Sequence, residues 1–375
     1  MRAVVCRSPG ELALEERPEA RRGDGEVLIA VRRIGICGTD YHIYEGSHPY
    51  LRYPRVIGHE LSGEVLEAPP RSTFRRGQRV VVNPYLSCGA CVACRKGKPN
   101  CCVRIAVLGV HSDGGMCERI AVPERNLYPA ENLTFDEAAS VEFLSIGAHA
   151  VIRSGVKPGD RVLVIGAGPI GLGVALFAGL AGGEAAAMMD KDVGRLDFAL
   201  QTGIAGESIA ADDRAAERVG EATGGEGFDI VIDATGNRSS MEQAVLYVAH
   251  GGALALVSVV NDAVAFSDPE VHKREMTIIG SRNALRADFE TVMAALEAGD
   301  VPLESLITHR TSIAGVAGDL PRWASEKRGL VKALVQIECP AGSSSWAPAD
   351  SFRRMPISSS TRPGARVRIS GRSQS

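Results

Sequence analysis

The sequence lacks the hydrophobic segments that mark exported and membrane-spanning chains. Residues 1–10 contain no long apolar run before Pro9, so we expect no signal peptide and a cytoplasmic location. Residues 162–181 are apolar over a length that suits a membrane helix. Five glycines and a proline interrupt this stretch, and its start is typical of a strand. We therefore expect a strand–turn–helix unit there and no membrane partner.

The sequence also lacks a strong excess of charge. The formal net charge is −3 over 375 residues, a length that predicts two domains. Residues 340–375 contain six Arg and one Asp, so this segment carries +5 and the rest of the chain carries −8. An acidic body argues against nucleic acid as a partner. The basic segment is rich in Gly, Ser and Pro without hydrophobic periodicity, which predicts a disordered tail.

A disulfide-like cysteine pattern is absent too, in keeping with a reduced cytosolic protein. Four of the nine cysteines follow no spacing pattern, namely Cys6, Cys101, Cys117 and Cys339. Four others have the spacing C-x2-C-x2-C-x7-C, namely Cys88, Cys91, Cys94 and Cys102. Four thiolates at such spacings close a tetrahedral zinc site without an open position, which is typical of a structural zinc. From spacing alone, Cys101 competes with Cys102 for the fourth place.

The surrounding segment, about residues 84–104, is rich in glycine and polar residues. It has little apolar core, so we expect the metal to hold this lobe folded.

A second set of metal-type side chains lies within residues 35–60. Cys37 and His59 carry a thiol and an imidazole, two ligand types that suit zinc, and Glu60 follows His59 directly. Thr39 and His42 lie between Cys37 and His59 in the sequence. Taken alone, a buried thiol and scattered surface histidines explain this set equally well.

Glu142 lies on an otherwise apolar stretch. Thr134 and Glu137 form a capping box that predicts the start of a helix just before it. A carboxylate on an apolar helix face needs a partner, which is either a metal or a salt bridge.

Short alternating runs surround the second set. Val27, Ile29 and Val31 share one face of an expected strand, and residues 60–68 and 77–85 predict two more. Strands separated by Gly and Pro turns indicate a small β-barrel.

A glycine-rich turn follows a buried-type strand further along the chain. Gly166, Gly168 and Gly171 have the spacing G-x-G-x-x-G, with Pro169 and Ile170 at the start of the next helix. The first glycine makes the turn, the second lets a pyrophosphate approach the backbone, and the third packs the helix on the strand. The context of strand, turn and helix predicts a dinucleotide site.

Asp190 ends the next apolar run, 19 residues after Gly171. An acid at this place binds the ribose 2′-hydroxyl and repels a 2′-phosphate, which favours NAD over NADP. Lys191 and Arg195 weaken that preference a little.

Residues 228–236, 251–259 and 276–281 predict further buried strands with helices between them. The fold class is therefore α/β, with a barrel and a doubly wound parallel sheet of about six strands. Phe289, Val292, Met293 and Leu296 form one helical face, which we interpret as core.

Taken together, residues 1–339 resemble a zinc-dependent medium-chain alcohol dehydrogenase. The motifs that carry the resemblance are GICGTD, GHE, the four-cysteine segment and VIGAGPIGLG with its downstream acid. PNCC, LGVHSDGG, SDPEVHKRE and GSRNA resemble the polyol and sugar-acid branch, which is L-galactonate 5-dehydrogenase-like and close to sorbitol and threonine dehydrogenases. The resemblance implies a GroES-like catalytic domain at 1–145 and 286–339, around a Rossmann domain at 146–285.

The resemblance also implies roles for single residues. Catalytic zinc ligands are implied at Cys37, His59 and Glu142, with Glu60 beside the metal as an alternate ligand. Thr39 and His42 match a proton relay, and the structural zinc ligands match Cys88, Cys91, Cys94 and Cys102. The implied cofactors are two zinc ions per subunit and NAD, and the implied assembly is a homodimer or homotetramer. One departure concerns Phe143, because a proline usually follows the glutamate in this family.

The implied reaction is oxidation of a secondary hydroxyl of a sugar acid or polyol. A sugar acid calls for a basic pocket residue, for which Lys273, Arg274 and Arg282 are candidates by residue type, although surface positions suit all three. His111 either lines the pocket or belongs to a turn. Two other functions stay open: a dinucleotide-binding sensor with a decayed site, and a zinc-free quinone reductase-like enzyme.

Overall fold

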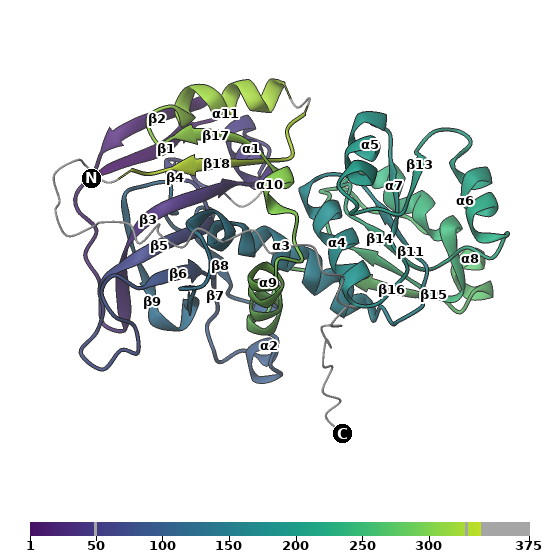
Figure 1. Cartoon of the computed structure of the whole chain (residues 1–375), viewed down its shortest axis with the longest axis horizontal. Coiled ribbons are helices and arrows are strands. Elements are labelled where there is room, and N and C mark those ends of the chain that lie inside the picture. Colours follow the sequence, from purple (N-terminus) through teal and green to yellow (C-terminus); the bar gives the residue numbers. More distant parts are fainter. Residues whose placement is uncertain (49–50, 327–328, 339–375) are drawn as a thin grey trace, which may run out of the picture.

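The structure of the chain is a computed structural model that describes residues 1–48, 51–326 and 329–338. The predicted tail at 340–375 lies outside these described residues, as does Cys339. The described chain forms two lobes that lie side by side, one built mostly of antiparallel strands and one around a parallel sheet (Figure 1). The predicted domain boundaries near residues 145 and 285 stay predictions.

The first lobe is barrel-like. A seven-stranded sheet has the order β10-β6-β5-β3-β18-β17, with β9 also paired to β3. A three-stranded sheet has the order β2-β1-β4, and β7 pairs with β8. The strands of this lobe are β1 (Arg2–Ser8), β2 (Glu11–Glu16), β3 (Glu26–Ile36), β4 (Arg55–Val56), β5 (Glu60–Glu67), β6 (Arg79–Val82), β7 (Tyr85–Leu86), β8 (Ala106–Val107), β9 (Arg119–Pro123), β10 (Leu127–Pro129), β17 (Ile307–Ser312) and β18 (Lys332–Gln336).

Strand β18, at the end of the described chain, returns to this sheet and lies between β3 and the edge strand β17. It runs antiparallel to β3, with Leu334 opposite Gly35, and parallel to β17. Apolar side chains of β18 such as Ala333 and Val335 are buried with the inner faces of β1 and β3. The first lobe is therefore built from both ends of the described chain.

The second lobe contains a six-stranded parallel sheet of order β13-β12-β11-β14-β15-β16. In chain order this is 3-2-1-4-5-6, the order of a dinucleotide-binding doubly wound sheet. Its strands are β11 (Val162–Ile165), β12 (Ala187–Asp190), β13 (Glu207–Ala210), β14 (Phe228–Asp233), β15 (Val248–Leu256) and β16 (Thr277–Gly280). Its helices are α4 (Pro169–Leu180), α5 (Val193–Gln201), α6 (Ala215–Thr223), α7 (Arg238–Gln243) and α8 (Asp268–Lys273), with the 3-10 turn η3 (Ala244–Tyr247).

Alternate residues of β11 face different cores. Val162 and Val164 pack into one buried cluster, and Leu163 and Ile165 pack into another on the opposite face. A strand that is buried on both faces is expected of a parallel sheet covered by helices, which confirms the predicted α/β class.

Helix α3 (Phe135–Ser154) packs against both lobes. The predicted capping box is present, because Thr134 Oγ1 accepts from the Glu137 N–H and Glu137 accepts from the Thr134 N–H. On its other side, Gly147 approaches α4 so closely that a Cβ there would lie 2.6 Å from the carbonyl carbon of Gly173. The glycine therefore lets the helix that bears Glu142 sit directly on the first helix of the parallel sheet.

Helix α9 (Arg286–Ala298) leads back to the first lobe. Phe289, Val292, Met293 and Leu296 are all buried, so the predicted core face is confirmed. The remaining short elements are α1 (Gly38–Glu45), α2 (Val92–Arg95), η1 (Pro99–Cys101), η2 (Glu124–Asn126), α10 (Leu303–Leu306) and α11 (Val316–Ser325). Within the described part of the chain, none of the helices combines the length and apolar character needed to cross a bilayer.

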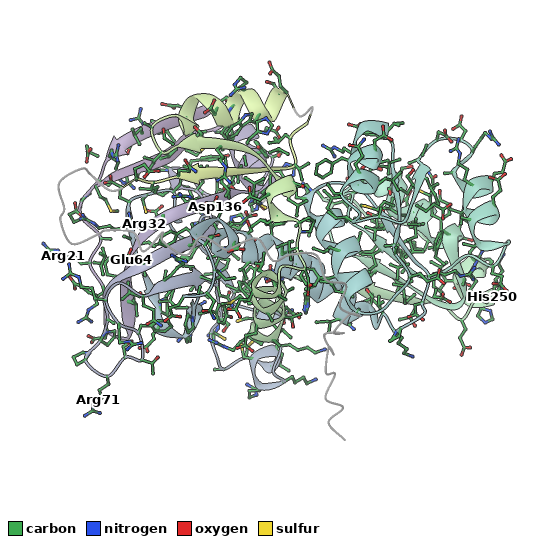
Figure 2. All side chains as sticks on the ribbon, in the orientation of Figure 1. Arg21, Arg32, Glu64, Arg71, Asp136 and His250 are labelled. Atoms are coloured by element: carbon green, nitrogen blue, oxygen red, sulfur yellow. The ribbon has the colours of Figure 1, made fainter. Side chains whose placement is uncertain are left out.

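Ion pairs brace the outer side of the first lobe. Arg32 pairs with Glu64 at 3.3 Å, and Arg33 Nε lies 2.7 Å from Asp136 Oδ1 at the start of α3. Arg32, Glu64 and Asp136 lie together in Figure 2, whereas His250 lies at the far end of the second lobe. These pairs fix β3 against β5 and α3, the three elements that carry the side chains described next.

Candidate metal centre and dinucleotide site

The side chains of Cys37, His59 and Glu60 converge at one end of the seven-stranded sheet. Their ligand atoms all lie within 4.8 Å of one another. Cys37 directly follows β3 and is the N-cap of α1, whereas Glu60 starts β5 opposite Gly35. Because β3 and β5 are antiparallel neighbours, the end of one strand lies beside the start of the other.

Asp40 fixes the two chain segments that carry this centre. Its side chain is fully buried, accepting from the Cys37 N–H at 2.9 Å and from the Gly58 N–H at 3.1 Å. Burial raises the pKa of Asp40, an effect that the charge of His59 and the two N–H donors oppose. Asp40 was not predicted as part of the site, although an acid three positions after a helix cap is a recognisable signal.

A buried ammonium group lies beside Glu60. Lys332 Nζ contacts both carboxylate oxygens of Glu60 and donates to the Ile36 carbonyl at 3.1 Å. It also lies 4.4 Å from the ring centroid of Phe143. Lys332 was not predicted, although a lysine that starts the apolar run KALVQI at the end of the described chain was visible.

Glu142 approaches the same centre from α3 and is 3% exposed. Burial raises its pKa, with Glu60 reinforcing the effect and His59 and Lys332 opposing it. The Tyr85 hydroxyl donates to Glu142 Oε1, and burial beside this carboxylate raises the pKa of Tyr85 well above its usual range. The hydrogen-bond partner of Glu142 is therefore a neutral phenol and not the salt bridge considered from the sequence. Glu142 lies outside the set of three donors, Cys37, His59 and Glu60, whose ligand atoms are all within 4.8 Å of one another.

The donor set fits zinc. A thiol, an imidazole and a carboxylate are the ligand types of catalytic zinc sites. Nδ1 of His59 is buried and has no hydrogen-bond partner among the described residues. Burial lowers the pKa of His59, but Cys37, Asp40 and Glu142 more than compensate, so the net pKa is well above the usual range. A buried imidazole surrounded by anionic groups suits a bound cation.

Thr39 and His42 lie on α1, next to the centre. Thr39 Oγ1 is 3.8 Å from Cys37 Sγ, and one helical turn later His42 is exposed, with Nδ1 3.2 Å from Ser47 Oγ. The helix therefore leads from the half-buried thiol to the surface.

The second cysteine set also converges. The ligand atoms of Cys88, Cys91, Cys94 and Cys102 lie within 4.8 Å of one another. Cys101 is exposed and lies outside this group. Backbone N–H groups and Arg104 lower the pKa of Cys88 to about 5, which favours the thiolate that binds zinc.

The glycine-rich turn has the backbone shape that the sequence predicts. Gly166 has φ +101°, and a Cβ on Gly171 would lie 1.7 Å from the Gly166 carbonyl oxygen. Gly168 caps α4, which starts at Pro169, and Ile170 is partly exposed beside it. The start of α4 therefore offers free backbone N–H groups to an anion.

Asp190 ends β12 and contacts the glycine-rich turn. Its Oδ2 accepts from the Ala167 N–H at 2.7 Å, and its Oδ1 accepts from the Asp192 N–H at 2.9 Å. Arg195 Nε lies 3.8 Å from Asp192 Oδ2, so an acid accompanies this cation.

The candidate basic residues separate into two groups. Lys273 is the last residue of α8 and Arg274 is its C-cap, and each forms an ion pair with Glu270. His111 belongs to a turn, where its Nδ1 accepts from the Val107 N–H at 3.1 Å. Arg282 is exposed, and after burial its charge is the largest influence that lowers the pKa of His111.

Comparison with known proteins shows the family to which this chain belongs. Residues 23–132 match the alcohol dehydrogenase GroES-like domain, and residues 169–298 match the zinc-binding dehydrogenase family. The L-galactonate-5-dehydrogenase of Escherichia coli is 38% identical over 336 residues, covering 89% of this chain and 98% of that protein. This chain belongs to the zinc-type alcohol dehydrogenases.

Other members of the family resemble this alcohol dehydrogenase over similar lengths. Sorbitol dehydrogenase of Halalkalibacterium halodurans is 31% identical, covering 81% of this chain and 90% of that protein. The crystal structure of the alcohol dehydrogenase RspB from Escherichia coli, complexed with NADH, matches with a TM-score of 0.84 at 31% identity, covering 90% and 99% of the two chains. The predicted family, fold and enzyme class are therefore confirmed, and so is the prediction of zinc and a nicotinamide dinucleotide as cofactors of this family.

Proposed function

We propose that this dehydrogenase oxidises a secondary hydroxyl of a sugar acid or polyol to a ketone, with NAD as hydride acceptor. The observation that carries the proposal is the convergence of Cys37, His59 and a buried carboxylate in a chain that also holds a dinucleotide-type glycine turn. A bound zinc supplies Lewis acidity toward the substrate oxygen. Three protein ligands leave such a metal one position for substrate.

The chain's own residues divide the remaining tasks. Cys37 and His59 would hold the metal together with Glu142 or Glu60. Thr39, beside the thiol, would relay the proton of the substrate hydroxyl, accepting it while its own O–H proton passes on toward His42. His42 passes a proton to solvent, because its side chain is 62% exposed on the same helix. Positioned proton transfer of this kind contributes about 10²- to 10⁴-fold to a rate.

NAD rather than NADP is the proposed oxidant. Asp190 keeps its carboxylate beside the turn through Ala167, and each carboxylate oxygen retains a lone pair for a ribose hydroxyl. A 2′-phosphate would meet the same charge, which disfavours NADP.

The four-cysteine lobe is proposed to hold a second, structural zinc. All four positions around such a metal are taken by thiolates, so this site has no place for a substrate. The stoichiometry is therefore two zinc ions per subunit.

A sugar acid is the favoured substrate, with a neutral polyol as the alternative. Similarity to an L-galactonate-5-dehydrogenase supports the acid. Of the three candidate basic residues, Arg282 is the one without an ion pair of its own among the described contacts, and it is close enough to His111 to lower the pKa of that imidazole. Arg282 is therefore our candidate for the carboxylate.

We further propose a cytoplasmic homodimer or homotetramer. Strand β16 is one of the two edge strands of the parallel sheet, and Ile278 on it is 39% exposed. An exposed apolar edge strand is a template for pairing with another chain.

NADH formation from NAD, followed by absorbance across a panel of aldonates and polyols, tests the function. We expect turnover with L-galactonate or a related aldonate, and loss of turnover in Cys37→Ser. The matched control is Cys101→Ser, because Cys101 is exposed and outside both donor sets. Unchanged turnover in zinc-replete Cys37→Ser protein would overturn the zinc mechanism, and dinucleotide binding without turnover on any substrate would favour the sensor.

A further inference from the structure

The segment that follows β16 connects the parallel sheet to α9 and carries Arg282. Just before it, the Ser281 N–H donates to the Leu256 carbonyl at the end of β15 at 2.9 Å. Ligands of doubly wound sheets bind outside the carboxyl ends of the strands. Arg282 therefore follows directly on the edge of the sheet where the dinucleotide is proposed to bind.

Asn100, in the four-cysteine lobe, binds this segment at two points. Its side-chain Nδ2 donates to the Arg282 carbonyl at 2.9 Å, and its own carbonyl accepts from Asn283 Nδ2 at 3.1 Å. Asn283 has φ +51°, a left-handed conformation that asparagine adopts more readily than most residues with a Cβ. The two hydrogen bonds therefore fix the chain at Arg282 and at the residue after it.

Asn100 is itself held in one orientation. The residue is 4% exposed, and its Nδ2 also lies 3.2 Å from Nε2 of His149 on α3. Because an amide nitrogen only donates, His149 Nε2 is the acceptor, and His149 Nδ1 donates to Asp288 Oδ2 at 2.8 Å. Asn100 lies in η1, two residues before Cys102 of the cysteine cluster. Its position therefore depends on both α3 and the cysteine lobe.

The charge of Arg282 acts on the first lobe. After burial, it is the largest influence that lowers the pKa of His111, which lies in a turn of that lobe. Burial also lowers the pKa of His48, and the charges of His111 and His59 add to this effect. Arg282 therefore lies toward the side of the first lobe that holds the metal centre. A guanidinium group in such a place suits a carboxylate, which it binds through two parallel hydrogen bonds.

We propose that Asn100 is a positioning residue that holds Arg282 in place for the carboxylate of a sugar acid. This inference rests on the sugar-acid function proposed above and gives the four-cysteine lobe a task in substrate binding. Without the Asn100 side chain, the Arg282 carbonyl loses this donor and its segment loses an anchor, so the guanidinium group meets the carboxylate less well. Cys37 and His59 have no hydrogen bond to Asn100 in the described part of the chain, so they stay in place.

The test is the turnover and binding of L-galactonate by Asn100→Ala. The KM should rise about 10- to 100-fold with kcat within about threefold of the unmodified value, because a misplaced binding group weakens binding rather than chemistry. Binding of L-galactonate to the enzyme–NADH complex, followed by NADH fluorescence, should weaken to a similar extent without any turnover. Zinc content and NADH affinity should match those of the unmodified protein.

A double-variant cycle shows whether Asn100 acts through Arg282. Arg282→Met removes the guanidinium group and should raise the KM at least as much as Asn100→Ala does. Arg282→Met/Asn100→Ala should then bind L-galactonate no more weakly than Arg282→Met alone, because the amide has nothing left to position. Asn132→Ala is the matched control: its exposed side chain reaches Glu297 on α9 at 3.4 Å, and its loss should leave the KM unchanged.

Asn283→Gly tests the same contact without altering the cysteine lobe. Glycine keeps the left-handed backbone but removes the hydrogen bond to the Asn100 carbonyl. The KM should rise about 2- to 10-fold, the usual effect of one hydrogen bond. If Asn100→Ala loses zinc or does not fold, this variant decides, and an unchanged KM in Asn283→Gly overturns the inference.

The remaining outcomes separate the inference from the function. An unchanged KM and unchanged L-galactonate binding in folded Asn100→Ala overturn the inference while the function stands. Losses that multiply in the double variant overturn it as well, because Asn100 would then act independently of Arg282. An unmodified enzyme that oxidises only neutral polyols overturns the choice of a sugar acid and the inference with it. An enzyme that forms no NADH from any aldonate or polyol overturns the proposed function itself.

Discussion

Nδ1 of His149 lies 2.8 Å from Oδ2 of Asp288, and both side chains are buried. On the other side of the ring, Nε2 of His149 lies 3.2 Å from Nδ2 of Asn100, in the four-cysteine lobe. Asp288 also accepts from the Leu285 N–H at the start of α9. This network joins the cysteine lobe to α3, which carries Glu142, and to the helix that returns from the parallel sheet.

His149→Ala should therefore destabilise the protein by about 1–3 kcal/mol, because it leaves the buried carboxylate of Asp288 without a side-chain partner. Urea unfolding measures the change. Glu290→Gln is the matched control on α9, since its ion pair with Arg286 is exposed and of little energetic value. Equal stability of the two variants would contradict a structural role for the network.

Cys91→Ser should lower the zinc content from about two ions to about one per chain. A serine hydroxyl does not replace the thiolate, and the lobe has little core without its metal. Metal analysis and thermal melting measure both effects. Cys101→Ser should keep both ions, because Cys101 lies outside the cluster. Retention of two ions in Cys91→Ser would rule out the four-thiolate site.

Asp190→Ala should weaken the preference for NAD over NADP by about tenfold or more, which corresponds to about 1.4 kcal/mol. The change removes the charge that opposes a 2′-phosphate and also releases the Ala167 N–H. The measurement is the ratio of kcat/KM for the two dinucleotides. Asp192→Ala, which removes the cap of α5, should leave that ratio unchanged. An unaltered ratio in Asp190→Ala would refute the ribose role.

Thiol labelling should depend on pH in a residue-specific way. Burial raises the pKa of Cys117 to about 12, and burial with the charge of Glu11 raises that of Cys6 to about 11. The reactive form is the thiolate, and at pH 8 roughly one Cys117 thiol in 10⁴ is ionised. Raising the pH increases that fraction, but both thiols should stay largely unlabelled by iodoacetamide up to about pH 10.

Peptide mapping by mass spectrometry reads out this labelling. The exposed Cys101 should react first in zinc-loaded protein. Rapid modification of Cys117 at pH 8 would show that its burial is not maintained in solution.

Much of the fold follows from local sequence signals. The glycine turn, the spacing of the four cysteines and the capping box of α3 are each set by neighbours within a few residues, so the sequence predicts them. The parallel sheet follows because each buried strand alternates with a helix. The family and its fold are confirmed, whereas the roles of individual site residues stay predictions.

Other parts of the centre depend on contacts between distant segments. Lys332 meets Glu60 across 272 positions of sequence, and no periodicity links them. The choice between Glu60 and Glu142 stayed open in the sequence for the same reason. Tyr85, the partner of Glu142, comes from a two-residue strand that the sequence pattern placed only as the end of a longer one.

The placement of β18 has a consequence for biosynthesis. A ribosome releases β3 and β5 early, then the whole parallel sheet, and only afterwards the strand that carries Lys332. Domains of nascent chains fold in the order in which they emerge. The dinucleotide lobe therefore finishes before the metal centre acquires its lysine, and a translation product that stops short of β18 holds Glu60 as an uncompensated charge.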